Sequence, residues 1–204
     1  MKIGIISDVH ANLAGLEMAL TFLEAQQVDK ILCAGDLVDR GDDNEAVVAH
    51  MRGQNIPIVQ GNHDFSGARN SIYTKATRDF LFRLPHEHRL EREGRTLYMT
   101  HAAPWSRMFY VFPHAYRYVF ERVIQQAQAD IVILGHTHTP MQVTMPDGSM
   151  ILNPGTTNPN ASYQRNVSTC AVLTLADAVD YTVYNTRTGQ IIRHDTVTLD
   201  TAGY

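Results

Sequence analysis

The chain has 204 residues, of which 44% are hydrophobic and 19% are charged, and its formal net charge is −4 at pH 7. This composition is ordinary for a globular protein and argues against a disordered or membrane-embedded chain. The charge offers no broad basic face, so nucleic acid held mainly through its phosphates is not expected, whereas a nucleotide substrate is compatible. No Pro/Gly/Ser-rich linker interrupts the sequence, and we predict one domain over residues 1–204.

The first apolar run and the two cysteines indicate in which cellular compartment the protein is located. The run from Ile3 to Ile6 meets Asp8 and His10 too early for a signal peptide, and no run reaches the length of a membrane span. We therefore expect a cytoplasmic protein with no membrane partner. Cys33 and Cys170 each fall in a predicted strand, which favours buried, reduced thiols over a disulfide or a pair of metal ligands.

The first part of the chain alternates between predicted strands and predicted helices. In chain order we expect a strand over Lys2 to Ser7, a helix capped by Asn12, a strand over Lys30 to Ala34, a helix over Asn44 to Met51, a strand over Ile56 to Val59 and a helix over Ala76 to Leu84. Leucines at positions 13, 16, 20 and 23 recur at helical spacing in the first of these helices. The alternation predicts parallel strands joined by helical crossovers.

The later part of the chain is richer in predicted hairpins. We expect strands over Arg89 to Glu91, Arg95 to Thr100, Ile131 to Leu134, Met141 to Met145, Met150 to Asn153, Val167 to Thr174, Tyr181 to Asn185 and Ile191 to Leu199. Turn residues separate several of them, as in the Pro146-Asp147-Gly148 tripeptide. Two stacked sheets with helices outside would bury all of these strands, so the predicted fold class is α/β.

The segment from Trp105 to Gln128 has a different character. An aromatic-rich loop leads to Pro113 at a predicted helix start. The apolar residues expected on one face of that helix are Tyr116, Val119, Phe120, Val123 and Ala127. Two alternatives stay open: the segment is a core or dimer face, which would give a homo-oligomer through residues 105–128, or it is a lid over the functional site. A lid could bring His114 toward a substrate.

Metal-capable side chains follow five separate apolar runs. They are Asp8 and His10, Asp36, Asn62 and His63, His101, and His136 and His138. Residues two apart on an extended chain lie on the same face, so Asp8 with His10, or His136 with His138, can converge on one point. Asp36 directly follows Gly35, which permits close approach of backbone and metal, and is the candidate centre of a two-metal site.

This ligand set indicates the metals and the chemistry. Carboxylate, amide oxygen and imidazole ligands suit divalent Mn, Fe, Zn, Ni or Co, and no cysteine lies near them in sequence. Two such ions about 3.5 to 4 Å apart, bridged by one carboxylate, acidify a shared water and bind the oxygens of a phosphoryl group. The sequence therefore predicts hydrolysis of a phosphoester by a metal-bridging hydroxide, without a nucleophile from the protein.

Taken together, the motifs resemble those of the calcineurin-like metallophosphoesterase superfamily. The matching stretches are Asp8-Val9-His10, Gly35-Asp36-Leu37-Val38-Asp39-Arg40, Gly61-Asn62-His63-Asp64, Thr100-His101 and Gly135-His136-Thr137-His138. The opening Ser7 to Asn12 and the segment Asn153 to Thr156 are most similar to the compact bacterial and archaeal phosphodiesterase branch. The resemblance implies a four-layer α/β/β/α sandwich of two mixed sheets, with a dinuclear metal site at the strand ends.

The resemblance also implies a role for each motif residue. It assigns one metal to Asp8, His10, Asp36 and His138, and the other to Asp36, Asn62, His101 and His136, so that Asp36 bridges. His63 matches the family's catalytic histidine, which donates a proton, and Asp39 matches the acid that orients it. Arg40 stands where protein phosphatases and dinucleoside tetraphosphatases carry a phosphate-binding arginine that the compact branch often lacks.

The expected function is a metal-dependent phosphoesterase acting on a small phosphodiester or nucleotide. A phosphomonoesterase or a dinucleoside tetraphosphatase is an alternative, and so is a non-catalytic metal-binding scaffold, because a protein-sorting member of the superfamily works as a binding subunit. A scaffold has no use for a proton donor, so the presence of His63 with Asp39 favours an enzyme. A nuclease would need a basic path for the strand, which the net charge does not indicate.

Overall fold

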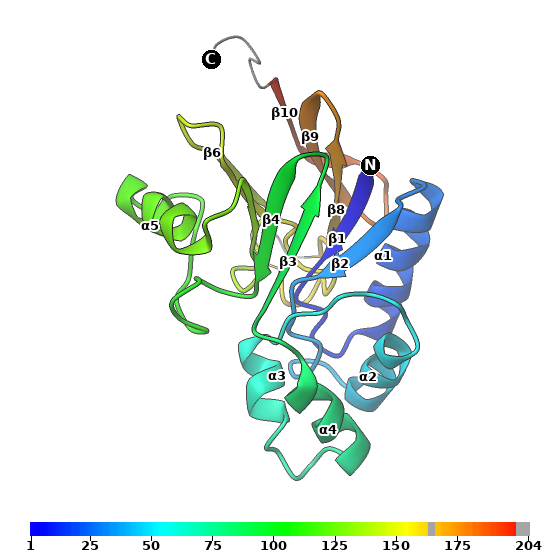
Figure 1. Ribbon diagram of the computed structural model, residues 1–204. Helices are drawn as coiled ribbons and strands as arrows, with labels where there is room; N and C mark the ends of the chain where they lie inside the picture. Colours follow the sequence, from blue (N-terminus) through cyan, green and yellow to red (C-terminus); the bar gives the residue numbers. More distant parts are fainter. Residues whose placement is uncertain (163–165, 199–204) are drawn as a thin grey trace.

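The computed structural model describes residues 1–162 and 166–198, and its two five-stranded sheets lie face to face between helices (Figure 1). The helices are α1 (Leu13–Ala25), α2 (Asn44–Arg52), α3 (Asn62–Gly67), α4 (Lys75–Arg83) and α5 (Arg117–Ala127). The strands are β1 (Lys2–Ile6), β2 (Lys30–Cys33), β3 (Glu87–Arg92), β4 (Arg95–Thr100), β5 (Ile131–Ile133), β6 (Met141–Thr144), β7 (Met150–Asn153), β8 (Thr169–Leu175), β9 (Ala178–Asn185) and β10 (Ile191–Thr198).

Both sheets mix parallel and antiparallel pairs. The first has the order β10-β9-β8-β1-β2, with β1 parallel to β2 and antiparallel to β8. The second has the order β3-β4-β5-β7-β6, in which β4, β5 and β7 are parallel. Helix α1 connects β1 to β2, and α5 connects β4 to β5, as expected for parallel neighbours, which cannot be joined by a tight turn. The predicted α/β/β/α sandwich of two mixed sheets is confirmed.

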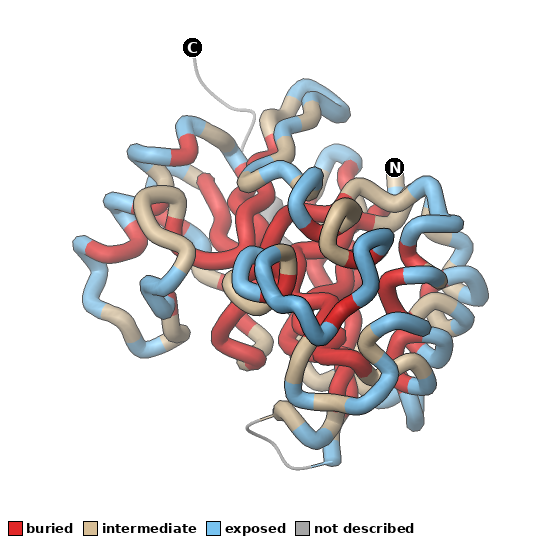
Figure 2. Tube along the Cα trace, turned by 90° about the horizontal axis from the view of Figure 1, so that it is seen from below, coloured by how far each residue is buried: buried red, intermediate tan, exposed pale blue. Residues whose placement is uncertain are grey.

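Strand alternation divides the core into three layers. Side chains such as Ile3 and Ile5 of the first sheet and Leu97 of the second form the cluster between the sheets. The opposite face of the first sheet packs on α1 and α2, and the opposite face of the second sheet packs on α5. Buried residues accordingly follow the centre of the molecule, while the outer turns of the helices are exposed (Figure 2). This packing holds the ends of the parallel strands in fixed positions.

Local signals in the sequence account for several elements as predicted. The side chain of Asn12 caps α1 by accepting a 2.9 Å hydrogen bond from the backbone N–H of Gly15, and Leu16 and Leu23 bury the helix on the sheet. Cys33 and Cys170 are free and fully buried, as expected. Within the described residues, no helix is long and apolar enough to cross a membrane.

Three predictions of elements need correction. Ile56 to Val59 is not a strand but makes one parallel bridge to β2 through Ile58, because Pro57 has no N–H to donate to a ladder. Helix α5 begins at Arg117 and not near Pro113, which leaves Tyr116 as its N-cap, 76% exposed and away from the apolar face. The short helix α3 was not predicted. Leu199, the last residue of the final predicted strand, lies outside the described residues.

Candidate metal centre

The predicted metal-binding residues meet where the parallel strands end. Asp8 follows β1, Asp36 follows β2, His101 follows β4 and His136 follows β5. Because the two sheets are stacked, the carboxyl ends of their strands face one another at a single edge of the sandwich, below β1 and β2 in Figure 1. All four residues are buried. The structure therefore brings together side chains that are far apart in the sequence.

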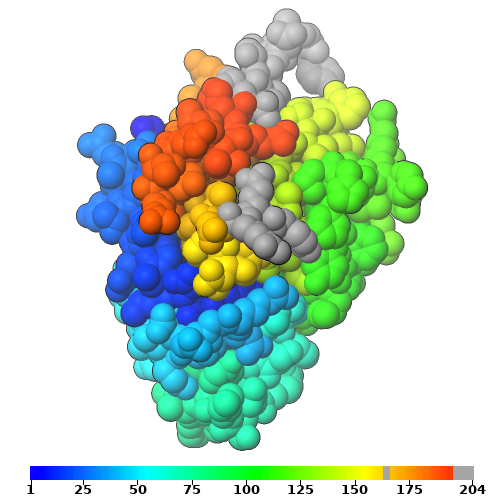
Figure 3. Space-filling view, turned by 180° about the vertical axis from the view of Figure 1, so that it is seen from behind, coloured from blue at the N-terminus to red at the C-terminus, as the bar shows by residue number. Residues whose placement is uncertain are grey.

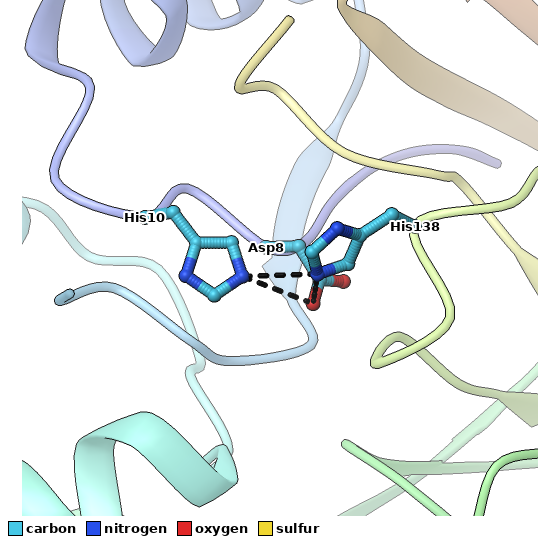
Figure 4. Close-up of side chains that lie close together, drawn as sticks. All are labelled: Asp8, His10 and His138. Atoms are coloured by element: carbon cyan, nitrogen blue, oxygen red, sulfur yellow. Dashed lines mark hydrogen bonds and ion pairs between the residues drawn. The ribbon is translucent and has the colours of Figure 1, made fainter. Parts of the chain in front are cut away.

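The first group consists of Asp8, His10 and His138 (Figure 4). The Nε2 atoms of His10 and His138 face each other at 3.0 Å. Asp8 Oδ1 lies 3.2 Å from Nε2 of His138 and 3.8 Å from Nε2 of His10. The other carboxylate oxygen, Oδ2, accepts hydrogen bonds from the Ser7 hydroxyl and the His136 backbone N–H. One oxygen of Asp8 is thus used to hold the loop, and the other points at the two imidazoles.

The second group contains Asp36, His101 and His136, with Asn62 beside it. Nε2 of His101 lies 3.1 Å from Asp36 Oδ2 and 3.1 Å from Asn62 Oδ1. Asp36 Oδ2 is also 3.8 Å from Nε2 of His10, which belongs to the first group. Asp36 therefore stands between the two groups, in the position that a bridging ligand requires.

The four histidines of these groups use their ring nitrogens in the same way. The Nδ1 atoms of His10, His101 and His138 lie 3.3, 2.6 and 2.7 Å from the backbone oxygens of Val38, Ala34 and Ala161, respectively. The ring of His136 hydrogen-bonds to the backbone of Met108, and its buried Nε2 has no hydrogen-bond partner among the described residues. A carbonyl oxygen only accepts, so Nδ1 carries a proton, and in the neutral ring Nε2 presents a lone pair.

This donor set fits divalent metal ions. Lone pairs and carboxylate oxygens repel one another unless a cation lies between them, and imidazole nitrogen, carboxylate and amide oxygen are ligands of borderline divalent metals. Burial lowers the pKa of both His10 and His136 to about 4, which keeps these rings neutral at pH 7. Burial acts against charge on His101 too, but the Asp36 and Asp8 carboxylates raise its pKa to about 10. The negative charges of Asp8 and Asp36 thus stabilise a positive charge between these side chains.

His63 and Asp39 form the predicted pair beside the two groups. Nδ1 of His63 lies 2.8 Å from Asp39 Oδ2, and the hydroxyl of Tyr73 donates to Asp39 Oδ1 at 2.9 Å. The His63 ring stands edge-on to the His10 ring, with 5.0 Å between the ring centroids. The backbone N–H of His63 donates to Asp36 Oδ1 at 2.9 Å, which ties α3 to the metal centre. Tyr73 was not predicted, because only the fold brings it to Asp39.

Asp64 binds the backbone next to the metal centre. From the sequence it was known only as a member of the Gly61 to Asp64 motif. Its carboxylate is fully buried and accepts hydrogen bonds from the backbone N–H groups of Asp36, Leu37 and Gly61 at 2.8, 2.8 and 3.0 Å. Burial, together with the charge of Asp36, raises the pKa of Asp64 to about 6. A side chain at Gly61 would overlap the Asp36 carboxylate, so this position requires glycine. These contacts fix the backbone on both sides of the metal centre.

We predict that Asp64→Ala destabilises the metal-free protein by roughly 3 to 5 kcal/mol, because it leaves three buried N–H groups without an acceptor. Urea unfolding measured with and without metal tests this. Asp64→Asn keeps one acceptor oxygen and should lose about half as much. The exposed Asp42 is a matched control, and Asp42→Ala should change the free energy of unfolding by less than about 0.5 kcal/mol. Equal effects of Asp64→Ala and Asp42→Ala would contradict the anchoring role.

The backbone of the centre is strained. Seven predicted site residues have positive φ, between 46° and 71°, namely Asp8, His10, Asp36, Asp39, Arg40, His136 and His138. This region is unfavourable for residues with a side chain, and such strain persists only where surrounding contacts impose it. The segment after β7 supplies some of these contacts, since Thr156 donates to the backbone oxygen of Asp8 and Asn158 to that of His10. Figure 3 shows this yellow segment lying against the blue N-terminal part.

The aromatic segment after β4 has two parts. On α5, the side chains of Val119, Phe120, Val123 and Ala127 are buried against the second sheet, which confirms core packing for that helix. The preceding loop lies at the metal centre, where the ring of Tyr110 stacks on the ring of His136 with centroids 3.9 Å apart. His114 is separated from Tyr110 by Phe112 in the same stack of rings. A homo-oligomer through residues 105–128 stays a prediction.

Arg40 lies exposed at the edge of the centre. Burial and, to a smaller extent, the charge of Arg40 oppose the upward shift that Asp8 causes in the pKa of His138. This position is compatible with the predicted contact to a phosphate group, and the contact itself stays a prediction.

Known proteins share both this fold and this sequence pattern. The family model of the calcineurin-like phosphoesterase superfamily domain matches residues 1–178. The phosphodiesterase MJ0936 of Methanocaldococcus jannaschii is 25% identical, over 76% of this chain and 83% of that protein. The crystal structure of a metallophosphoesterase from Sphaerobacter thermophilus is 25% identical, with a TM-score of 0.70 over 85% of this chain and 84% of that chain.

A third protein shares the fold. Vps29 from Entamoeba histolytica, crystallised with Zn²⁺, is 20% identical, with a TM-score of 0.64 over 97% of this chain and 98% of that chain. Since the family model covers most of the sequence, this chain belongs to the calcineurin-like phosphoesterase superfamily.

Proposed function

We propose that the protein is a phosphoesterase that uses two divalent metal ions to hydrolyse a phosphodiester or nucleotide-type substrate. Asp8, His10 and His138 would hold one ion, Asn62, His101 and His136 the other, and Asp36 would contact both. The observation that carries this proposal is the convergence of imidazole Nε2 atoms and carboxylate oxygens on one buried space, with each imidazole oriented by a backbone contact at its other nitrogen.

When bound, the ions would supply a nucleophilic water at neutral pH and positive charge for the phosphoryl oxygens. The protein supplies their positions and a proton. His63 faces the same space as the ligands and has Asp39 at its Nδ1, so its Nε2 is the atom that would donate a proton to the leaving oxygen. Tyr73 holds Asp39 from the other side and fixes the orientation of the pair. Arg40 adds charge at the exposed edge of the centre, where a phosphate would enter.

A non-catalytic scaffold is the second candidate function, because Vps29 shares this fold. The side chains themselves favour the enzyme. Metal ligands alone would serve a scaffold equally well, whereas the 2.8 Å contact between His63 and Asp39 would orient a proton donor, for which a scaffold has no use. Activity measurements decide between the two candidates.

The test is removal and return of metal. The purified protein is stripped with a chelator, reloaded separately with Mn, Zn, Ni, Fe and Co, and assayed on nitrophenyl mono- and diesters and on nucleotides. We expect the stripped protein to lose at least about 10²-fold in rate, and at least one metal to restore it. Higher kcat/KM for diesters would support a phosphodiesterase. Higher kcat/KM for monoesters would instead support a phosphomonoesterase, and higher kcat/KM for dinucleoside tetraphosphates would support a dinucleoside tetraphosphatase. Metal binding without hydrolysis of any substrate would support the scaffold.

A further inference from the structure

Two arginines share one phenylalanine ring next to the metal centre. The guanidinium carbon of Arg69 lies 4.1 Å, and that of Arg107 4.9 Å, from the centroid of the Phe65 ring. Each contact is a cation–π interaction, worth about 0.5 to 1 kcal/mol at an exposed site. Arg69 also donates a 2.8 Å hydrogen bond to the backbone oxygen of Phe65. The ring therefore contacts two positive charges, those of the exposed Arg69 and the half-buried Arg107.

Neither of these charges is neutralised within the protein. Among the described residues, the arginine ion pairs are those of Arg89 with Glu87 and Arg117 with Glu121, so no carboxylate oxygen lies within 4.0 Å of Arg69 or Arg107. Nε of Arg107 is shielded from solvent and has no hydrogen-bond partner in the described part of the chain. Two like charges held by one ring repel each other, and an anion placed against both guanidiniums would relieve this repulsion.

Both arginines are connected to the residues of the second metal group. Asn62, Phe65 and Arg69 are spaced by three and four residues along α3 and its end, so they lie on one side of that helix. Arg107 comes six residues after His101, and the next residue, Met108, hydrogen-bonds to the ring of His136. The two charges are therefore carried by the two segments that also hold residues of the second metal group, one by the end of α3 and one by the loop after β4.

The loop that carries Arg107 is held in place by its own contacts. The backbone N–H of Ser106 donates to Ala103 at 2.9 Å, and the rings of Trp105 and Phe109 pack with centroids 5.3 Å apart. Arg122 of α5 lies over the Trp105 ring at 4.1 Å. Positioning by such contacts lowers the conformational entropy that Arg107 would lose on binding a ligand.

We propose that Arg69 and Arg107, on the Phe65 ring, form a second anion site that selects phosphoesters carrying a second phosphate group. The substrate class is a nucleoside diphosphate, a nucleoside bisphosphate or an ester of either. The ring of Phe109 on the same loop is partly exposed and suits a flat base. The inference rests on the proposed function in one respect, which is that the first phosphoryl group of the ligand binds at the metal centre.

The test is equilibrium binding of AMP, ADP and adenosine 3′,5′-bisphosphate to the metal-loaded protein, measured by isothermal titration calorimetry. We expect at least one of the doubly phosphorylated ligands to bind about tenfold tighter than AMP. Arg107→Gln and Arg69→Gln should each remove most of this preference while leaving the Kd of AMP within about twofold of its original value. Arg117, which is paired with Glu121 on α5, is the matched control, and Arg117→Gln should change none of the three affinities.

Equal affinity of the wild-type protein for all three ligands would overturn the second anion site. So would a loss in Arg107→Gln and Arg69→Gln that is the same for AMP as for the doubly phosphorylated ligands, since that would be a general effect of net charge. The outcome is separable from the proposed function. If the protein prefers doubly phosphorylated ligands through these arginines but hydrolyses nothing, the second anion site is supported and the phosphoesterase function is contradicted. If it hydrolyses substrates without this preference, the phosphoesterase function is supported and the second anion site is contradicted.

Discussion

Asp36→Asn is expected to reduce metal binding at both groups at once and to lower the rate of phosphoester hydrolysis by at least about 10³-fold. Asp36 Oδ2 is the carboxylate oxygen near both His101 and His10, so loss of its charge affects both sites. Asparagine keeps an oxygen that can accept the bond from the His63 backbone, so the fold of the loop should be maintained. Elemental analysis of the purified variant measures the metal bound per chain.

Asp8→Asn is the matched control for this experiment. Asp8 belongs to the first group, where its Oδ1 lies 3.2 Å from Nε2 of His138, and lies 4.0 Å from Nε2 of His101. We therefore expect Asp8→Asn to lose mainly one ion per chain. If Asp36→Asn retained two ions per chain at the affinity of the wild-type protein, Asp36 would not be the shared ligand.

The second large effect is expected for His63→Ala, and it should depend on the leaving group. Removal of a general acid typically costs 10² to 10⁴-fold in rate, about 3 to 5 kcal/mol of barrier, but only where the leaving oxygen needs a proton. An alkoxide or nucleoside leaving group needs one, and nitrophenolate largely does not. We therefore expect His63→Ala to keep its metal, to lose heavily on alkyl or nucleoside esters and to lose much less on nitrophenyl esters.

Two further variants make this result specific. Asp39→Asn should show the same dependence on the leaving group with a smaller loss of rate. This substitution weakens the orientation of His63 but leaves the imidazole that would donate the proton. His50→Ala changes a histidine on α2 that lies 4.0 Å from Glu17, and it should leave all rates unchanged. An equal loss of His63→Ala on both ester classes, with metal intact, would show that His63 acts on the phosphoryl oxygens and not as the proton donor.

The positions of the proposed metal ligands could be predicted from the sequence because several of them come within three residues of the end of a strand. Asp8, Asp36 and His101 come two, three and one residues after β1, β2 and β4, so placing the strands also places these proposed ligands. The capping of α1 by Asn12 was equally predictable, since the cap and its partner Gly15 are three residues apart. Local signals of this kind were sufficient to predict the α/β fold class and the residues of the candidate metal centre.

Contacts between distant segments could not be predicted in this way. The backbone oxygens that orient His101 and His138 belong to Ala34 and Ala161, which are 67 and 23 residues away. The strand expected at Ile56 to Val59 depended on apolar residues alone, and the missing donor of Pro57 reduces it to one bridge. Any residue type supplies a backbone oxygen, so the sequence carries no specific signal for these contacts.

The most direct test of the two-ion centre is an anomalous difference map from crystals of the protein grown with Mn²⁺. We predict two peaks per chain, one among Asp8, His10 and His138 and one among Asn62, His101 and His136, with Asp36 contacting both. A single peak at saturating Mn²⁺, or two peaks of which only one contacts Asp36, would contradict the proposed centre.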